Sequence, residues 1–244
     1  MAEFHLKIAG HTARITSLFE STPQYFRPYL TEDPAEFSVA VTKENIDFEQ
    51  ADLLEEALRD GFRPRVFTDP FLERAAIQRA FAEFLFDYDI LLFHGSAIAV
   101  DGEGYLFTAH SGTGKSTHTR LWKQVFGDRA VMVNDDKPFL EIADQKVILH
   151  GSPWSGKHGL DANISVPLKG LCHLERGIEN HIAPLSPEVI LPMLRKQAYQ
   201  PLVEEKHPRF LDLTMRLSQQ VALWNMACNK NADAAEMAYS AMRK

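Results

Sequence analysis

A short glycine-rich stretch, S-G-T-G-K-S-T at residues 111–117, constrains the fold of this chain more than any other feature of its sequence. An apolar run precedes the stretch and a helix-forming run follows it. Gly112 and Gly114 allow the backbone to turn several N–H groups inward, and the following helix adds the positive end of its dipole. This order predicts a phosphate-binding P-loop, although Ala109 occupies the first glycine position of the usual pattern G-x-x-x-x-G-K-S/T.

The loop residues are expected to bind the phosphates of a nucleoside triphosphate. Lys115 is expected to lie along the β- and γ-phosphates, and the Ser116 hydroxyl is expected to bind Mg²⁺. The loop residues assigned to the cofactor are Ser111, Gly112, Thr113, Gly114, Lys115, Ser116 and Thr117. The following helix is predicted from about Lys115 to Val125, because Gly127 suits the position just after a helix end.

The strand that enters the loop is predicted to be the second arm of a β-hairpin. Apolar runs at 91–100 and 105–109 flank Asp-Gly-Glu-Gly, and such turns join antiparallel strands. In most P-loop proteins a parallel strand, buried on both faces, enters the loop instead. The sequence therefore predicts an α/β fold with a mixed sheet, in which a hairpin leads into the P-loop.

Further along the chain, an apolar strand ends in two carboxylates, Asp135 and Asp136. A strand that brings carboxylates beside a P-loop is typical of metal-dependent phosphoryl transfer. One acid can hold Mg²⁺, and the other can accept the proton of an attacking hydroxyl. The alternative is a solvent-exposed turn, because Asn-Asp-Asp-Lys-Pro is also rich in turn-forming residues.

Together these segments resemble the C-terminal catalytic domain of HPr kinase/phosphorylase, of which the ATP-dependent phosphoenolpyruvate carboxykinases are distant relatives. The resemblance covers residues 90–176 and rests on Phe93-His94-Gly95, the hairpin, S-G-T-G-K-S and the strand ending in Asp135-Asp136. It implies an HPr kinase/phosphoenolpyruvate carboxykinase-like P-loop core. That family also carries an arginine-bearing C-terminal loop, which has no counterpart here, so HPr recognition and the reverse phosphorylase reaction are not carried over.

The same resemblance implies roles for individual residues. His94, Lys115 and Asp135 are the expected catalytic residues, with Asp135 as the base that takes the proton of the acceptor. Asp136 is expected to support the metal together with Ser116. His94 is expected to orient or polarise Asp135, and its alternative role is that of a histidine satisfied in the core.

A loop at residues 150–163, H-G-S-P-W-S-G-K-H-G-L-D-A-N, contains too much glycine and proline for regular structure. Lys157 is expected to contact a phosphate of the cofactor. Trp154 is expected to stack on the base or to exclude water. The alternative is a rigid loop held by a buried tryptophan.

The chain is predicted to consist of a small β-rich N-terminal portion, residues 1–65, and a kinase-like core, residues 66–244. Strands are expected within residues 5–19 and 36–48, where apolar residues alternate or form short runs. A helix is expected at 69–87, where apolar residues recur along one helical face. The later elements are expected as a helix at 186–201 that is kinked or ended near Pro192, helices at 208–220 and 232–242, and a strand at 221–228.

The amino-acid composition limits the classes of binding partner and the cellular compartment that we expect for this chain. A net charge of −7 argues against a groove for nucleic acid. No apolar run reaches the length of about 18 residues that a membrane span needs. The two cysteines, Cys172 and Cys228, have neither a disulfide-framework nor a zinc-site spacing, which favours a reducing cytoplasm. A homo-oligomer is compatible with all of these observations.

The expected activity is Mg²⁺-dependent transfer of a phosphoryl group from ATP, or from another nucleoside triphosphate, to a hydroxyl. The resemblance favours a serine of a protein or of a ribosomally made peptide as the acceptor, because small relatives of the family are associated with peptide maturation. Two alternatives stay open: a kinase of a small-molecule hydroxyl, and a regulatory module that binds a nucleotide without catalysis.

Overall fold

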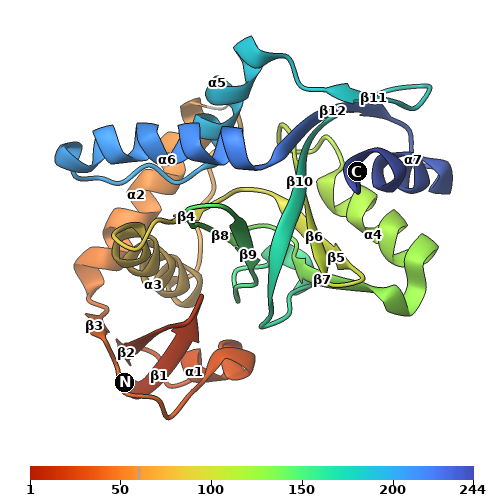
Figure 1. Cartoon of the computed structure of the whole chain (residues 1–244). Coiled ribbons are helices and arrows are strands. Elements are labelled where there is room, and N and C mark those ends of the chain that lie inside the picture. The colour runs from red at the N-terminus through yellow and green to blue at the C-terminus, as the bar shows by residue number, and fades with distance from the viewer. Residues whose placement is uncertain (60) are drawn as a thin grey trace. The chain divides into compact units, whose positions relative to one another are not determined.

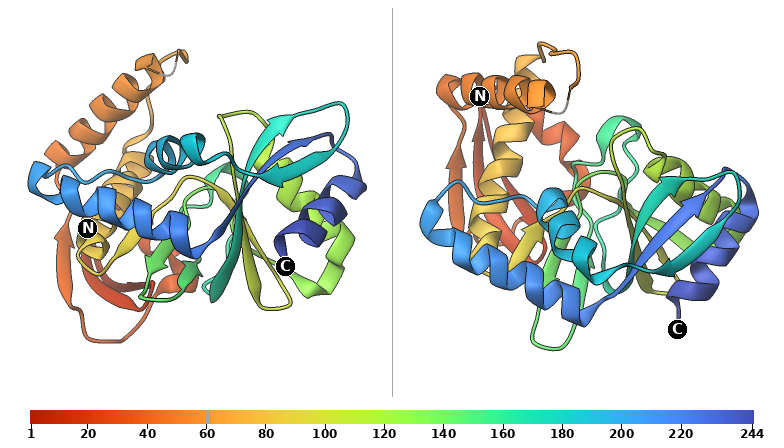
Figure 2. Two further views of the ribbon diagram at one scale, coloured as in Figure 1. Left: turned by 45° about the horizontal axis from the view of Figure 1, so that its top comes forward. Right: turned by 90° about the horizontal axis from the view of Figure 1, so that it is seen from above.

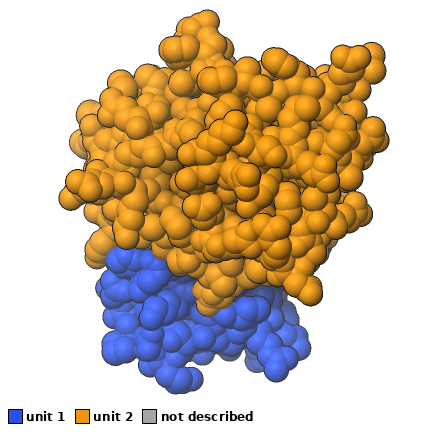
Figure 3. All heavy atoms as spheres, turned by 45° about the vertical axis from the view of Figure 1, so that its right-hand side comes forward, with its two compact units in different colours: residues 1–84 blue, residues 85–244 orange. Residues whose placement is uncertain are grey.

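The structure is a computed structural model that describes residues 1–59 and 61–244. By compactness the chain divides into two units, Met1–Phe84 and Leu85–Lys244 (Figure 3). The sequence predicts that two independently folding parts meet after residue 65. That boundary stays a prediction. Within the described ranges, no helix is both long and apolar enough to cross a membrane.

The N-terminal unit is built from a three-stranded sheet and helices (Figure 1). Its elements are β1 (Ala2–Ile8), β2 (His11–Ser17), α1 (Thr22–Tyr25), the 3-10 turn η1 (Arg27–Tyr29), β3 (Phe37–Ala40), α2 (Lys43–Arg59) and most of α3 (Asp69–Phe86). β1 and β2 form an antiparallel hairpin, and β3 pairs parallel with β2 at the edge of the sheet. The helix predicted at 69–87 is confirmed by α3.

The strand predicted at residues 36–48 is only partly right, because β3 ends at Ala40 and α2 begins at Lys43. The reason is a local cap. The Thr42 backbone N–H donates to Asn45 Oδ1 at 2.9 Å, and the Asn45 backbone N–H faces Thr42 Oγ1 at 3.4 Å. Reciprocal bonds of this kind satisfy N–H groups that a helix start leaves unpaired.

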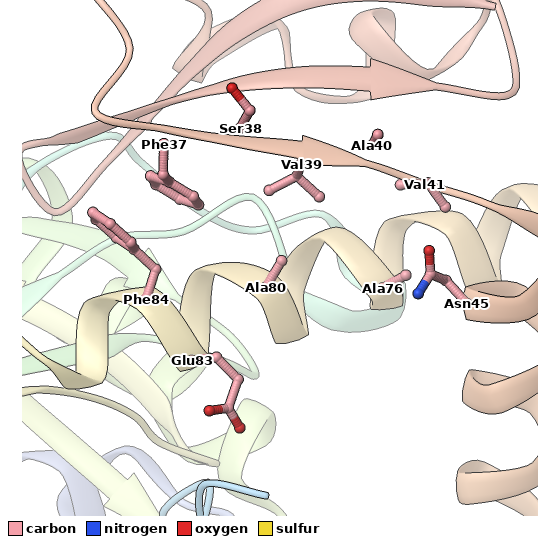
Figure 4. A pocket seen from close by; sticks show the side chains of 10 residues that line it. All are labelled: Phe37, Ser38, Val39, Ala40, Val41, Asn45, Ala76, Ala80, Glu83 and Phe84. Atoms are coloured by element: carbon pink, nitrogen blue, oxygen red, sulfur yellow. The ribbon is translucent and has the colours of Figure 1, made fainter. Parts of the chain in front are cut away.

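The N-terminal unit contains a hollow of about 480 Å³ between β3 and α3 (Figure 4). The rings of Phe37 and Phe84 stack at one end of it, with centroids 3.7 Å apart. Val39, Ala76 and Ala80 contribute apolar surface along its length. This hollow is separate from the P-loop, which belongs wholly to the other unit.

The C-terminal unit contains a nine-stranded mixed sheet, so the predicted α/β class is confirmed. Its strands are β4 (Ile90–Leu92), β5 (Ser96–Val100), β6 (Glu103–Thr108), β7 (Ala130–Asn134), β8 (Phe139–Ile142), β9 (Val147–His150), β10 (Ser165–Arg176), β11 (His181–Pro184) and β12 (Ala222–Cys228). Its helices are α4 (Lys115–Phe126), α5 (Pro187–Gln197), α6 (His207–Gln220) and α7 (Ala232–Met242), with 3-10 turns η2 (Gly127–Arg129), η3 (Gly156–His158) and η4 (Glu204–Lys206). The strand order is β4-β8-β9-β10-β6-β5-β7, and β12 pairs with β10 and β11.

Helices cover both faces of this sheet. α4 and α7 lie on one face, and α5 and α6 lie on the other (Figures 1 and 2). The alternation of side chains along a strand produces this division. In β5, Ala97 and Ala99 pack on the side of α5 and α6, whereas Ile98 and Val100 pack on the side of α4 and α7.

The hairpin that enters the P-loop is confirmed by antiparallel pairing of β5 with β6, down to Val100 opposite Glu103. The turn consists of Asp101 and Gly102, both with positive φ, at 52° and 83°. Two such residues suit the tight hairpin turns whose twist matches that of the strands. The later helices and β12 also agree with the predictions, except that α5 continues through Pro192 to Gln197.

Candidate nucleotide site

The P-loop joins β6 to α4 and leaves the start of the helix open. α4 begins at Lys115, and no side chain caps it, because Gly114 stands at the N-cap position with φ at 128°. The first N–H groups of a helix have no partner within the helix, so an uncapped start can bind an anion. Lys115 Nζ folds back over the loop and donates to the Ala109 carbonyl oxygen at 3.4 Å.

Ala109 does not disturb this loop. Its side chain is 1% exposed and packs in the core beneath α4. Its φ is not positive, so the position has no need of glycine. Gly112 and Gly114 do have positive φ, at 76° and 128°, where a side chain would be strained. The variant position is therefore compatible with a working phosphate loop.

Sheet topology explains how distant segments meet at this loop. β5 pairs antiparallel with both β6 and β7, so its first residues lie beside the last residues of those two strands. Ser96 faces Phe107 at the end of β6, and Ala97 faces Asn134 at the end of β7. Gly95 permits the close approach, because a Cβ there would lie 2.9 Å from the Phe107 carbonyl oxygen.

Asp135 lies beneath the first turn of α4. It is 5% exposed, and Ser96 Oγ donates to its Oδ1 at 2.6 Å. The Ser96 hydroxyl also lies 2.8 Å from Thr119 Oγ1, which in turn lies 3.4 Å from the carbonyl oxygens of Lys115 and Ser116. This chain of contacts brings the Asp135 carboxylate toward the turn that carries Ser116.

Asp136 has a different environment from Asp135. His94 Nε2 lies 3.4 Å from Asp136 Oδ1, and each of these side chains is about a third exposed, at 34% and 35%. The printed contact of His94 is thus with Asp136, and the expectation that His94 orients Asp135 stays a prediction. The two acids follow the end of β7 in a bend, and their carboxylates have different partners, Ser96 for Asp135 and His94 for Asp136.

Charges around Asp136 keep it ionised. Burial alone would raise the pKa of Asp136, but Lys137, His94 and Lys115 together lower it to about 2. Burial lowers the pKa of His94, and Lys137 lowers it further against the opposing effect of Asp136. Burial also lowers the pKa of Lys115. The site thus holds an ionised carboxylate beside a histidine whose neutral form is favoured.

Asn134 holds the turn at Asp136 and Lys137 in place. It is fully buried, and its Oδ1 accepts the backbone N–H groups of Asp136 and Lys137 at 2.7 and 2.6 Å. Its Nδ2 donates to the carbonyl oxygen and hydroxyl of Ser152 at 2.8 and 3.0 Å. The residue therefore joins the acidic turn to the loop at 150–163. Sequence reasoning missed Asn134, Ser96 and Thr119, although V-N-D-D-K-P and H-G-S were visible as polar residues next to apolar strands.

Replacing Asn134 with alanine is expected to lower the free energy of unfolding by about 2–4 kcal/mol, because several buried hydrogen bonds are lost together and their partners stay buried. Urea denaturation of the two proteins measures this. Gln145→Ala, an exposed position in the turn between β8 and β9, is the control and should change stability by less than about 0.5 kcal/mol. Equal effects at the two positions would contradict the anchoring role of Asn134.

The loop at 150–163 approaches Asp136 through Gly156. This glycine has φ at 68°, and a Cβ on it would lie 3.2 Å from the Asp136 Cβ. Trp154 is 7% exposed and lies edge-on to Phe139, so it holds the loop from inside rather than offering a free ring face to a base. Lys157 is exposed, and no hydrogen bond or ion pair among the described residues joins it to the P-loop.

β10 braces the other side of the loop. It pairs parallel with β6, with His173 opposite Thr108. From its last residue, Arg176 Nη2 donates to the Gly112 carbonyl oxygen at 2.6 Å. Arg176 was not predicted as part of the site, because only the parallel pairing of β6 with β10 brings it near the loop.

The oxygen donors at this site suit a Mg²⁺ ion that is held mainly by the phosphates of a bound nucleotide. The described chain contains no group of three or more His, Cys, Asp and Glu side chains that could hold a metal alone. Mg²⁺ in nucleotide sites takes one or two protein oxygens and completes its shell with phosphate oxygens and water. The Ser116 hydroxyl and the neighbouring aspartates are oxygen donors of this kind.

A hollow of about 590 Å³ adjoins the P-loop. Its walls come from the loop, the first two turns of α4, the end of β10 and the residues that follow β12. His118 on α4 is one of the lining residues and is 2% exposed. Its Nε2 accepts a hydrogen bond from Trp122 Nε1 at 3.1 Å.

Because burial lowers the pKa of His118 from 6.5 to about 4, the protein is expected to lose stability as the pH falls between these values. Between these pH values His118 binds a proton in the unfolded chain but stays neutral in the folded chain. The free energy of unfolding therefore falls, by about 3 kcal/mol at pH 4 from this residue. Well above pH 6.5 His118 is neutral in both the folded and the unfolded chain, so the residue contributes no pH dependence there. Urea denaturation from pH 7 to pH 4 should show a flatter profile for His118→Gln; parallel profiles would contradict the buried neutral ring.

Comparisons with known proteins give little beyond this geometry. No protein-family model matches the chain, and no curated protein matches it. Among solved structures, the chain is similar to the structure of the Hpr(Ser) kinase/phosphatase from Coxiella burnetii. The two share 13% identical residues with a TM-score of 0.36, over 62% of this chain and 93% of that chain. This is a distant likeness, and it does not by itself indicate what this chain binds or transforms.

Proposed function

We propose that this protein transfers the γ-phosphoryl group of a Mg²⁺-bound nucleoside triphosphate, ATP in the first instance, to a hydroxyl. The observation that carries the proposal is the position of Asp136. An ionised carboxylate paired with His94 lies in the electrostatic environment of Lys115, at the open start of α4. A purely nucleotide-binding module needs the loop and the lysine but has no use for a second, accessible carboxylate with its own histidine.

In this proposal the P-loop holds the donor. Residues 111–117 surround the phosphates with backbone N–H groups, and Lys115 lies along the β- and γ-phosphates. Ser116 and Asp135 would hold Mg²⁺, and the ion would supply charge neutralisation on the phosphates. The support for Asp135 in this role is its buried position beneath the turn that carries Ser116. Lys157 is kept as a further phosphate ligand, since it follows Gly156, which lies against Asp136.

Asp136 then faces the acceptor and takes its proton, so the two aspartates exchange the roles expected from the sequence. A pKa of about 2 describes the carboxylate without a nucleotide. The negative charge of a bound γ-phosphate raises the proton affinity of a neighbouring carboxylate. His94, favoured in its neutral form, orients Asp136 through the contact at Nε2. Most of the rate enhancement comes from positioning and charge stabilisation.

The acceptor is proposed to be a serine of a protein or peptide, as the sequence resemblance implies, in a cytoplasmic setting. Incubation of the full chain with γ-labelled ATP and Mg²⁺ tests this against an array of serine, threonine and tyrosine peptides and a set of small alcohols. Label on serine peptides is the expected result. Label only on small alcohols would support a small-molecule kinase. Binding of Mg-ATP without transfer to any acceptor or to water would support the non-catalytic module and overturn the proposal.

A further inference from the structure

One buried polar atom beside the P-loop lacks a hydrogen-bond partner in the part of the chain that the structure describes. Nδ1 of His118 is buried, and no described residue forms a hydrogen bond with it. The same side chain lines the hollow of about 590 Å³ that adjoins the loop. Because buried polar atoms are almost always hydrogen-bonded, an exception at a hollow points to an atom of a ligand.

Trp122 determines which ring nitrogen of His118 carries the proton. The indole N–H can only donate, so His118 Nε2, at 3.1 Å from Trp122 Nε1, must be the acceptor. Burial keeps the ring neutral at pH 7, since it lowers the pKa of His118 to about 4. A neutral imidazole with an unprotonated Nε2 carries its single proton on Nδ1. The unpartnered atom is therefore a hydrogen-bond donor.

The rest of the hollow suits a flat heterocycle attached to phosphates. Leu121 of α4 and Leu174 of β10 give it apolar walls, whereas Arg176 and Lys230 bring positive charge. Its volume lies within the range of about 300–1,000 Å³ that is usual for ligand pockets. The hollow includes Gly112, Thr113, Gly114 and Thr117 of the loop, so a molecule whose phosphates sit at the start of α4 can extend directly into it.

We infer that this hollow takes the base of the donor nucleotide and that His118 Nδ1–H donates a hydrogen bond to an unprotonated ring nitrogen or carbonyl oxygen of that base. The inference rests on the proposed function, since the phosphates of the same molecule occupy the P-loop. His118 then selects the base and takes no part in the transfer step. Trp122 positions it by holding the proton on Nδ1.

Two substitutions and one probe test this inference in the full chain. In His118→Asn the amide nitrogen can replace Nδ1 as donor, whereas in His118→Gln the amide lies nearer the position of Nε2 and leaves no donor at Nδ1. His118→Gln is expected to weaken Mg-ATP binding about tenfold, as for the loss of one hydrogen bond, and His118→Asn by no more than about threefold. Ribose 5-triphosphate, which lacks a base, should bind the wild type and both variants equally. Isothermal titration calorimetry measures all six affinities.

A parallel loss of affinity for ATP and ribose 5-triphosphate in His118→Gln would overturn the inference, because the residue would then act through the shape of the loop. Equal binding of the two ligands to the wild type would also overturn it, while leaving the P-loop in place. Failure of the wild type to bind either ligand would instead count against the proposed function. Nitrogen-15 NMR of the unmodified protein avoids the effect of a substitution on folding. His118 should be protonated at Nδ1. The Nδ1–H signal should shift when ATP is added but not when ribose 5-triphosphate is added.

Discussion

Replacing Lys115 with methionine is expected to weaken the binding of Mg-ATP about 100-fold and to reduce phosphoryl transfer to background. The lysine is the charged group that reaches back over the loop, with Nζ 3.4 Å from the Ala109 carbonyl oxygen. A charge-assisted hydrogen bond to phosphate contributes about 2–3 kcal/mol, which corresponds to a factor of about 30–150 in affinity. Methionine keeps most of the length of the side chain and removes its charge.

Lys146→Met is the matched control for this prediction. Lys146 is exposed in the turn between β8 and β9, so its loss changes the net charge equally without touching the loop. Equilibrium binding of a fluorescent ATP analogue and calorimetry should give an unchanged Kd for the control. If both variants bind Mg-ATP as tightly as the unmodified protein, the loop at 111–117 is not a nucleotide site.

Replacing Asp136 with asparagine is expected to lower kcat for phosphoryl transfer about 1,000-fold while leaving the Kd for Mg-ATP within about threefold. General base catalysis contributes factors of about 10²–10⁴, and the amide cannot take the proton of the acceptor. Asparagine fills nearly the same space, and the backbone N–H of residue 136 still reaches Asn134 Oδ1. The loss should therefore fall on the chemical step, which single-turnover measurements with labelled ATP isolate.

Asp135→Asn is the comparison that assigns the roles of the two acids. If Asp135 supports the metal, its substitution should raise the Mg²⁺ concentration needed for half-maximal activity about tenfold or more, and excess Mg²⁺ should restore much of the rate. Asp136→Asn should show no such rescue. The opposite pattern would return the base to Asp135 and the metal to Asp136, as the sequence alone suggested.

The secondary structure of local segments could be predicted from the sequence, because it depends on residues that are neighbours in the chain. S-G-T-G-K-S-T, with apolar residues before it and Gly127 after α4, is sufficient for strand, loop and helix. The turn at Asp101-Gly102 requires positive φ at two successive positions, which this pair tolerates. The sequence did not predict α2, because the alternation of apolar and polar residues up to Val41 extends into the first turn of the helix. The capping contact between Thr42 and Asn45 marks where the helix starts.

The composition of the site could not be predicted to the same depth. The pairing of β5 with β7 brings Ser96 to Asp135, and the pairing of β6 with β10 brings Arg176 to Gly112. Neither pairing can be predicted from the residues near the P-loop, because the packing of the whole sheet determines which strands are neighbours.

The sequence by itself determined that a P-loop, a hairpin before it and two carboxylates after it are present, because each depends on residues adjacent in the chain. Only the tertiary structure decided which acid faces His94 and that His118 Nδ1 is buried beside the loop without a hydrogen-bond partner among the residues that the structure describes. The physical reason is that side-chain direction and burial depend on contacts between strands and helices far apart in sequence.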